Sequence, residues 1–236
     1  QNRDIDVRLR PLYRFAVSGQ KDNISYALDR GYENPLVSRM ESAMPVGVRI
    51  MNGNVEVGTE YVRQLESAAW SSDSAQAMFM RALYENYEKH YNAALSCYSA
   101  AIDRSEEAVG VEGLYRAFYY MNRGALRAEM IEFISSIENN VQVLSMDDTG
   151  NTRARVRDQV VRQYDYSDAI DDFKAAAAIV PDIPYVYFNL GNLYCLSKEH
   201  IESIANYTRA IELYPFMGDA YFNRGLVLIY LKDKEK

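Results

Sequence analysis

Apolar residues in the second half of the chain recur at the spacing of a helix. The longest stripe steps by 4, 3, 4 and 3 residues, through Met130, Ile134, Ile137, Val141 and Leu144. Such steps keep one face of a helix apolar. No Gly, Pro, Asn or Asp falls within residues 129–137, so we expect one uninterrupted helix through this stretch.

The first 60 residues show a different pattern, in which apolar and polar positions alternate. The alternating apolar positions are Ile5, Val7, Leu9, Val46, Val48 and Ile50. Alternation of this kind predicts strands. A two-residue turn, Asn52-Gly53, separates the last of them from Val55 and Val57, which is the spacing of a β-hairpin. We therefore expect residues 1–60 to be extended and to contain one hairpin.

A five-residue motif repeats along the second half with a period of 34 residues. Residues 187–191, Tyr-Phe-Asn-Leu-Gly, return as residues 221–225, Tyr-Phe-Asn-Arg-Gly, and Pro181 returns as Pro215. A related motif, Tyr-Met-Asn-Arg-Gly, occupies residues 120–124. Self-similarity at such a period indicates an array of helical repeats that share one core.

The unit at residues 184–217 resembles the tetratricopeptide repeat. The signature positions of that family are filled by Tyr187, Leu190, Gly191, Tyr194, Tyr207, Ala210 and Pro215, with Ser203 in place of the usual Ala. The resemblance implies a mainly α protein, an α-α superhelix of antiparallel helix pairs. Small residues at three of these positions let helix axes approach to ~8–10 Å, and stacked pairs then bury a continuous core.

We expect four such units within residues 61–236, after a joining helix over residues 59–69. They lie near residues 75–108, 117–183, 184–217 and 218–236. In the second unit, the small positions Gly124 and Ala169 lie 33 residues further apart than the period allows. Either a degenerate repeat boundary lies between them, or both helices lengthen into a projecting hairpin over residues 125–164. The lack of a helix breaker favours the hairpin, with its turn near residues 147–151.

The last unit, residues 218–236, holds only a first helix. Without a second helix, Leu226, Leu228 and Ile229 are expected to be bare. Two interpretations stay open: this helix caps the array, or the chain is a fragment of a longer array. General resemblance to other repeat proteins favours a bacterial envelope protein over a cytoplasmic one.

Composition narrows the classes of partner. The 236 residues carry 26 Lys and Arg against 33 Asp and Glu, a formal net charge of −7. Such a chain lacks the basic excess that releases counterions from nucleic acids, so no nucleic-acid partner is expected. The longest apolar runs, residues 175–180 and 226–231, are far shorter than the ~20 residues of a membrane span, so no transmembrane segment is expected. The two cysteines exclude a disulfide scaffold and a four-cysteine zinc site.

Little in the sequence resembles catalytic machinery. Ser18 and Lys21 have the Ser-x-x-Lys spacing of acyl-serine enzymes, but the companion motifs of that class are missing. His90 and His200 both fall in the short turn between the two helices of a unit, where we interpret them as structural loop residues. We therefore expect no enzyme, no catalytic residue and no cofactor.

An acidic cluster precedes and opens the helix that ends near Val180. It consists of Asp165, Asp168, Asp171 and Asp172. Because the helix dipole favours negative charge in the first turn, we interpret the cluster as a solvated helix start and expect no metal site.

The resemblance also implies a concave groove lined by the first helix of each unit. The groove residues in this chain are Tyr185, Phe188, Asn189, Asn192, Phe222, Asn223, Leu226 and Tyr230. One subclass of the family grips a peptide carboxylate with two Asn and several basic residues. Asn192 and Asn223 match the two amide positions, whereas Phe188 stands where the first Lys belongs. A second candidate surface on the returning arm of the hairpin carries Arg153, Arg155, Arg157 and Arg162, and arginines bind carboxylates in bidentate fashion.

The sequence therefore predicts a non-enzymatic scaffold that binds a partner protein or peptide in the groove, through the hairpin, or through both. An alternative is a self-assembling module that forms homodimers. A third is an acyl-serine enzyme that uses Ser18 and Lys21.

Overall fold

The computed structural model describes residues 14–18, 35–36, 47–51, 59–146 and 164–234. Within this part the protein is mainly helical, with two short strands. The helices are α2 (Thr59–Ala69), α3 (Ala75–Tyr87), α4 (Tyr91–Arg104), α5 (Gly110–Met146), α7 (Ser167–Ile179), α8 (Pro184–Leu196), α9 (His200–Leu213) and α10 (Gly218–Lys234). None of these helices is both long and apolar enough to cross a membrane.

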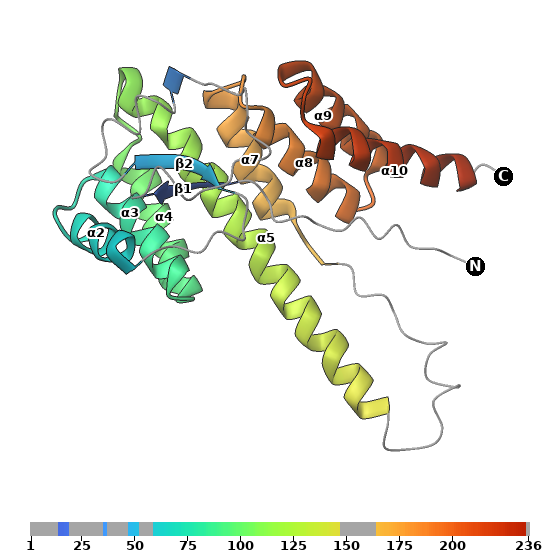
Figure 1. Cartoon of the computed structure of the whole chain (residues 1–236), viewed down its shortest axis with the longest axis horizontal. Coiled ribbons are helices and arrows are strands. Elements are labelled where there is room, and N and C mark those ends of the chain that lie inside the picture. The colour runs from blue at the N-terminus through green and yellow to red at the C-terminus, as the bar shows by residue number, and fades with distance from the viewer. Residues whose placement is uncertain (1–13, 19–34, 37–46, 52–58, 147–163, 235–236) are drawn as a thin grey trace.

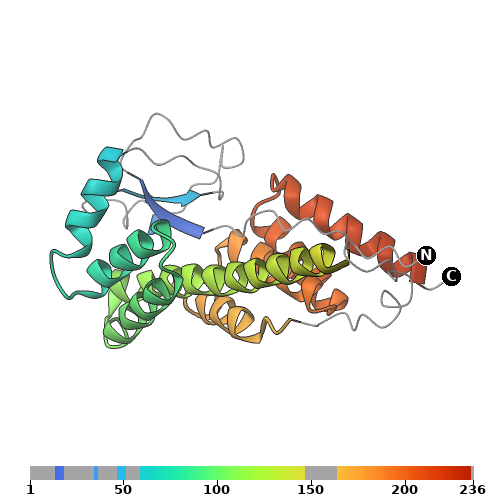
Figure 2. The same cartoon turned by 90° about the horizontal axis from the view of Figure 1, so that it is seen from below.

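Consecutive helices pack against one another in pairs. α3 packs on α4, α5 on α7 and α8 on α9, and α10 then packs on α9. Helices α2 to α4 lie at one end of the molecule and α8 to α10 at the other, with α5 and α7 between them (Figure 1). The same order is visible from below (Figure 2).

Local sequence signals explain where several of these helices begin. The Ser74 hydroxyl accepts a hydrogen bond from the Ala77 backbone N–H at 3.1 Å and so caps α3. This bond satisfies one of the free donors of the first helical turn. Pro184 begins α8, a position where the missing N–H costs no helical hydrogen bond.

The turns of the α3–α4 and α8–α9 pairs have the same backbone geometry. Lys89 and Lys198 adopt left-handed φ angles of 67° and 64°. The Lys89 N–H donates to the Asn86 carbonyl and the His90 N–H to the Glu85 carbonyl. The α8–α9 turn repeats this pair of bonds with its own residues. Each turn is thus a Schellman motif, which satisfies the last carbonyls of the first helix.

The long helix α5 spans 37 residues, or roughly 55 Å at 1.5 Å per residue. It runs without a break through residues 129–137, so no repeat boundary divides the chain there. Its C-terminal part projects beyond the packed body (Figure 1). Helix α7 begins only at Ser167, and the hydroxyl of Tyr166 donates to Glu132 on α5. The expected turn and most of the returning arm lie outside the described residues.

The two strands, β1 (Arg14–Ser18) and β2 (Gly47–Met51), pair in antiparallel fashion with Phe15 opposite Ile50. β1 lies against α5. The hairpin expected from the sequence pairs the segment around β2 with residues 55–57 instead. Those residues, like the alternating segment at residues 5–9, lie outside the described residues, so that pairing stays a prediction.

The core follows the small-residue positions of the helix pairs. A Cβ atom on Gly191 of α8 would lie 2.5 Å from the Tyr207 ring of α9, and one on Gly124 of α5 would lie 3.1 Å from the Phe173 ring of α7. Both rings are fully buried. The absence of a side chain on each glycine is therefore what lets a ring of the second helix pack directly on the first.

Candidate functional site

The structure places most of the expected groove residues in the core. Tyr185, Phe188, Asn189, Asn192 and Asn223 are buried, Leu226 and Tyr230 are half-buried, and Phe222 is exposed. The prediction that all eight side chains face a partner is therefore wrong for the five buried ones. Among this set, only Phe222, Leu226 and Tyr230 of α10 reach the surface.

Internal hydrogen bonds explain why the two Asn residues are not free to hold a peptide. The Asn192 side-chain oxygen accepts from the Tyr207 hydroxyl at 2.6 Å and from the Asn223 side-chain NH₂ at 3.0 Å. These bonds join α8, α9 and α10 at one buried point. Buried polar groups require such partners, so the amides that resembled a carboxylate clamp stabilise the array instead.

The exposed side of α10 is apolar. Phe222 is 62 % exposed, and Tyr221, Leu228 and Ile229 are exposed as well. Positions 221, 225, 228 and 229 follow the i, i+4, i+7, i+8 spacing of a single helix face. The expectation that the last helix leaves apolar residues bare therefore holds for Leu228 and Ile229, whereas Leu226 is half-buried.

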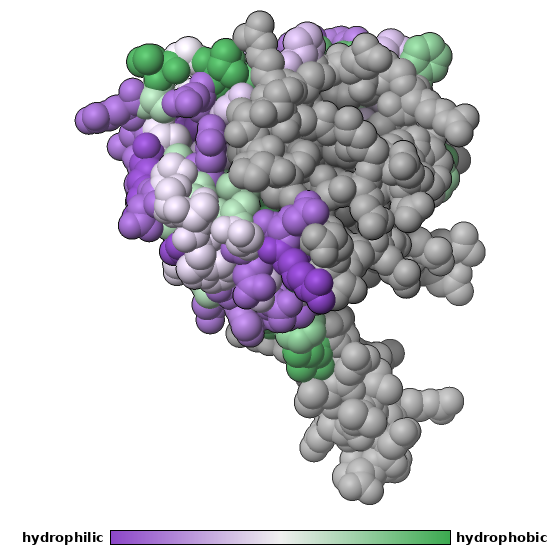
Figure 3. Space-filling view, turned by 60° about the vertical axis from the view of Figure 1, so that its left-hand side comes forward, coloured by the Kyte–Doolittle hydropathy of each residue, from purple (hydrophilic) through white to green (hydrophobic). Residues whose placement is uncertain are grey.

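A second apolar surface lies on α5. Phe133, Ile134 and Ile137 are about half exposed, and the Phe133 ring packs against the Tyr91 ring, with 6.4 Å between ring centroids. Figure 3 shows this hydrophobic patch where α5 leaves the packed body. We refer to these three residues as the α5 patch.

Some expected site residues lie outside the described residues. This is the case for Arg153, Arg155, Arg157 and Arg162, and for Lys21. Ser18 is the last residue of β1.

His90 lies in the turn where the sequence placed it, whereas His200 is the first residue of α9 rather than part of the turn. His90 immediately precedes α4, and its Nδ1 lies 2.9 Å from a carboxylate oxygen of Glu85. His200 begins α9, and its ring centroid lies 5.0 Å from that of Tyr230 on α10. Both rings therefore have local packing or hydrogen-bonding partners.

The acidic cluster differs from its expected form at Asp172. Asp165, Asp168 and Asp171 are exposed, but Asp172 is buried. The interpretation of all four as a solvated helix start is therefore wrong for Asp172. No group of three or more potential metal-ligating side chains occurs in the part of the chain that the structure describes.

Asp172 is held by two arginines of α5. Arg123 donates to both of its oxygens, with distances of 2.7 to 3.2 Å, and Arg127 Nη1 donates to Oδ2 at 2.8 Å. Burial raises the pKa of Asp172, and the two guanidinium groups oppose that shift. Arg123 also donates to the Ser99 hydroxyl on α4 at 2.9 Å. This cluster therefore ties α4, α5 and α7 together.

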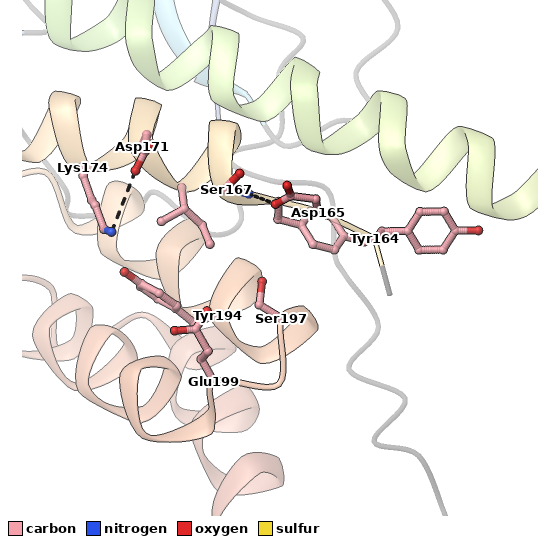
Figure 4. Close-up of a pocket in the computed structure, with 10 residues that line it drawn as sticks. Tyr164, Asp165, Ser167, Asp171, Lys174, Tyr194, Ser197 and Glu199 are labelled. Carbon is pink, nitrogen blue, oxygen red and sulfur yellow. Dashed lines mark hydrogen bonds and ion pairs between the residues drawn. The ribbon is translucent and has the colours of Figure 1, made fainter. Parts of the chain in front are cut away.

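An open pocket of about 480 Å³ lies between the start of α7 and the α8–α9 turn. Figure 4 shows the Lys174 side chain of α7 pointing toward Tyr194, which lies with Ser197 and Glu199 on the opposite wall of the pocket, while Asp171 lies on the other side of Lys174. Lys174 Nζ lies 4.0 Å from Asp171 and 5.8 Å from the Tyr194 ring centroid. The ammonium group of Lys174 and the carboxylate of Asp171 therefore pair with each other on α7.

The remaining contact in this pocket is structural. Asp165 accepts a hydrogen bond from the Ser167 backbone N–H at 2.9 Å, and this bond lowers the pKa of Asp165. A carboxylate that accepts a backbone N–H two residues later stabilises the turn into a helix. Among the residues drawn, the bonds in this pocket therefore organise the start of α7.

Sequence reasoning missed the Arg123–Asp172 cluster. The dipeptide Arg123-Gly124 recurs as Arg224-Gly225, but what the two arginines share is a hydrogen bond to a hydroxyl of the preceding helix, Ser99 or Thr208. The pairing of Arg123 with Asp172 leaves no such repeated signal in the sequence.

Comparison with known proteins adds no assignment. No family model matches the chain, and none of the curated proteins matches it significantly.

Proposed function

We propose that this protein is a non-enzymatic scaffold of the tetratricopeptide-repeat type, which binds another protein through exposed apolar side chains. The repeated turn geometry at Lys89 and Lys198 supports the repeat interpretation. So does the recurrence of a buried ring against a small residue in the α5–α7 and α8–α9 pairs. Arrays of this kind offer extended surfaces rather than enclosed reaction sites.

The single observation that carries the binding proposal is the α5 patch. Its three large apolar side chains are about half exposed on a helix that projects from the body. Adjacent exposed apolar residues on one helix are typical of protein-binding surfaces. An amphipathic helix or strand of a partner would cover them and gain roughly 25 cal/mol for each Å² of apolar area buried.

The test is site-specific crosslinking followed by reconstitution. A photoreactive amino acid at position 134 should crosslink one protein in cells of the source organism, and that protein is then purified. The double variant Phe133→Ser plus Ile137→Ser should weaken its binding at least tenfold, because two central apolar contacts are lost.

The matched control replaces two apolar residues elsewhere that are more exposed than those of the α5 patch. Val109→Ser plus Ile201→Ser alters side chains that are 87 % and 70 % exposed but lie away from the α5 patch, so binding should not change. A purified partner that binds all three proteins equally would contradict the proposal. Concentration-dependent dimers that only the α5 variant abolishes would favour the self-assembly alternative, and an acyl-serine probe bound to Ser18 would favour an enzyme.

A further inference from the structure

Two helices of the array carry nearly the same segment in different surroundings. Residues 120–124 of α5 read Tyr-Met-Asn-Arg-Gly, and residues 221–225 of α10 read Tyr-Phe-Asn-Arg-Gly. Both helices pack on the helix that precedes them, α5 on α4 and α10 on α9. The two segments therefore show which contacts the shared residues make in α5, where the following helix α7 packs on them, and in α10, where no following helix is described.

The arginines place the two segments equivalently on their preceding helices. Arg123 Nη1 donates to the Ser99 hydroxyl of α4 at 2.9 Å, and Arg224 Nη1 donates to the Thr208 hydroxyl of α9 at 3.0 Å. Ser99 and Thr208 each directly follow a fully buried tyrosine of their helix. The two Arg-Gly dipeptides thus start from the same position in the array.

In α5 this dipeptide is covered by an acid followed by an aromatic ring. Asp172 of α7 accepts a bidentate pair of hydrogen bonds from Arg123, from Nε to Oδ2 at 3.1 Å and from Nη2 to Oδ1 at 2.7 Å. The ring of Phe173, the next residue, packs against Gly124, and a Cβ atom added to Gly124 would lie 3.1 Å from this ring. The Arg-Gly dipeptide of α5 therefore forms a complementary surface for the Asp-Phe dipeptide of α7.

In α10 the equivalent surface is open. A Cβ on Gly225 would meet nothing within 4 Å. No carboxylate of the described residues pairs with Arg224, whose guanidinium carbon lies 5.6 Å from the centroid of its own neighbour, Tyr221. Around Gly225 the exposed side chains are apolar, among them Phe222 and Ile229. This face has the positive charge and the open space beside Gly225 that an acid and a ring would need, and none of the described residues supplies either.

We propose that the Arg224-Gly225 face of α10 binds an amphipathic helix of a partner protein that carries an acidic residue directly before an aromatic one. The carboxylate pairs with Arg224, and the ring packs on Gly225. Small residues four positions before the ring and three after it let the helices approach, as at Ala169 and Ala176 of α7. The proposal rests on the proposed scaffold function and assigns it a second surface with a defined ligand.

A second copy of this chain does not offer such a helix in its folded state. The rings of α4, α7 and α9 that occupy this position, Tyr98, Phe173 and Tyr207, are fully buried. Among the exposed aromatic residues that the structure describes, only Phe133 follows an acid. It has Glu129 four positions earlier, where the packed helices have Ala or Ser.

The test uses a labelled synthetic peptide with the sequence of residues 165–180, which holds the required pattern. Fluorescence anisotropy should show saturable binding to the full chain in the micromolar range. Gly225→Leu fills the open position and should weaken binding at least tenfold. The peptide variant Phe173→Ala should lose as much affinity with the unaltered chain.

A charge exchange tests the ion pair and keeps the experiment informative if Gly225→Leu affects folding. The chain variant Arg224→Glu should bind the original peptide about tenfold more weakly. The peptide variant Asp172→Lys should bind this Arg224→Glu chain with the original affinity. The control is the peptide variant Ala178→Leu, a small-to-large change at a position that is exposed in α7. This peptide should bind the unaltered chain with normal affinity.

Three results would overturn the proposal. They are no saturable binding up to millimolar peptide, binding that Gly225→Leu and Arg224→Glu leave unchanged, and self-association of the chain that Gly225→Leu abolishes. The α5 variant Phe133→Ser plus Ile137→Ser should bind the peptide normally. A failure at α10 is therefore distinguishable from a failure of the α5 patch.

Discussion

The Arg-Gly dipeptide of α5 is enclosed, and the same dipeptide of α10 is open. Arg123 bonds to a buried carboxylate and Gly124 lies beneath a ring, whereas Arg224 and Gly225 meet neither. Both segments form helix, and both bind a hydroxyl of the preceding helix. The local sequence thus determines the helix and its contact backward in the chain. Burial depends on what the rest of the chain, or a partner, supplies on the other face.

This difference separates two kinds of arginine that a charge count treats alike. The Arg123 side chain is 15 % exposed and its partner carboxylate 3 %, so removing one leaves the other buried with fewer partners. Loss of one member of a buried pair is strongly destabilising, whereas surface charges contribute little. The variants below test this contrast, beginning with the largest effect.

Replacing the arginine of the closed segment should destabilise the protein most. Arg123→Ala should lower the free energy of unfolding by roughly 3 kcal/mol, because Asp172 then keeps only Arg127. Arg224→Ala should cost less than about 1 kcal/mol, because it loses one hydrogen bond to Thr208. Urea denaturation followed by circular dichroism measures both. An equal loss of unfolding free energy in the two variants would mean that the pairing with Asp172 does not make Arg123 more stabilising than Arg224.

The small residues of the closed pairs should not tolerate enlargement. Ala176 of α7 is fully buried, and Ala178 on the same helix is exposed. Ala176→Leu should cost about 1–3 kcal/mol because the added carbons have no space, and Ala178→Leu should change stability by less than about 0.5 kcal/mol. Melting temperatures test this directly. An unchanged melting temperature for Ala176→Leu would contradict close packing of α5 and α7.

The closed α8–α9 pair also carries a chemical reporter in Cys195. Burial raises the pKa of this thiol to about 11, whereas an unfolded thiol ionises near 8.5. Between these values the native protein holds more protons than the unfolded chain, so its stability falls as the pH rises. The loss from this group should be roughly 1–2 kcal/mol at pH 10.

Cys195→Ala isolates this contribution. Its free energy of unfolding should fall less steeply between pH 8.5 and 10 than that of the unaltered protein, in parallel urea titrations. Identical slopes would show that the thiol is accessible to water in the native state.

Several elements could be predicted from the sequence because short-range signals determine them. The clearest case is the unbroken helix through residues 129–137, which follows from an apolar stripe without a helix breaker. The close approach of Gly191 and Tyr207 follows from the repeated small and aromatic positions. These features depend on helical periodicity and side-chain size, both of which can be read directly along the chain.

The candidate site was harder to predict because it depends on which faces meet. Asn192 and Asn223 match the amide positions that the resemblance implies for a peptide clamp, but they bond to each other, since α10 lies close enough to α8 to bury them. Asp172 sits within an acidic run and yet faces two arginines 45 or more residues away in the sequence. Neither outcome follows from periodicity, because both require the relative placement of neighbouring helices.

The central claim is that Gly191 and Gly225, 34 residues apart, hold the same position of the array, one covered by a ring and one open. Alanine at each position tests it by urea denaturation. Gly225→Ala should leave stability unchanged or raise it by up to about 1 kcal/mol, because Ala favours helix over Gly. Gly191→Ala should lower it by about 1–3 kcal/mol, because its Cβ would meet the Tyr207 ring at 2.5 Å. Changes of the same sign and size at both positions would contradict the account.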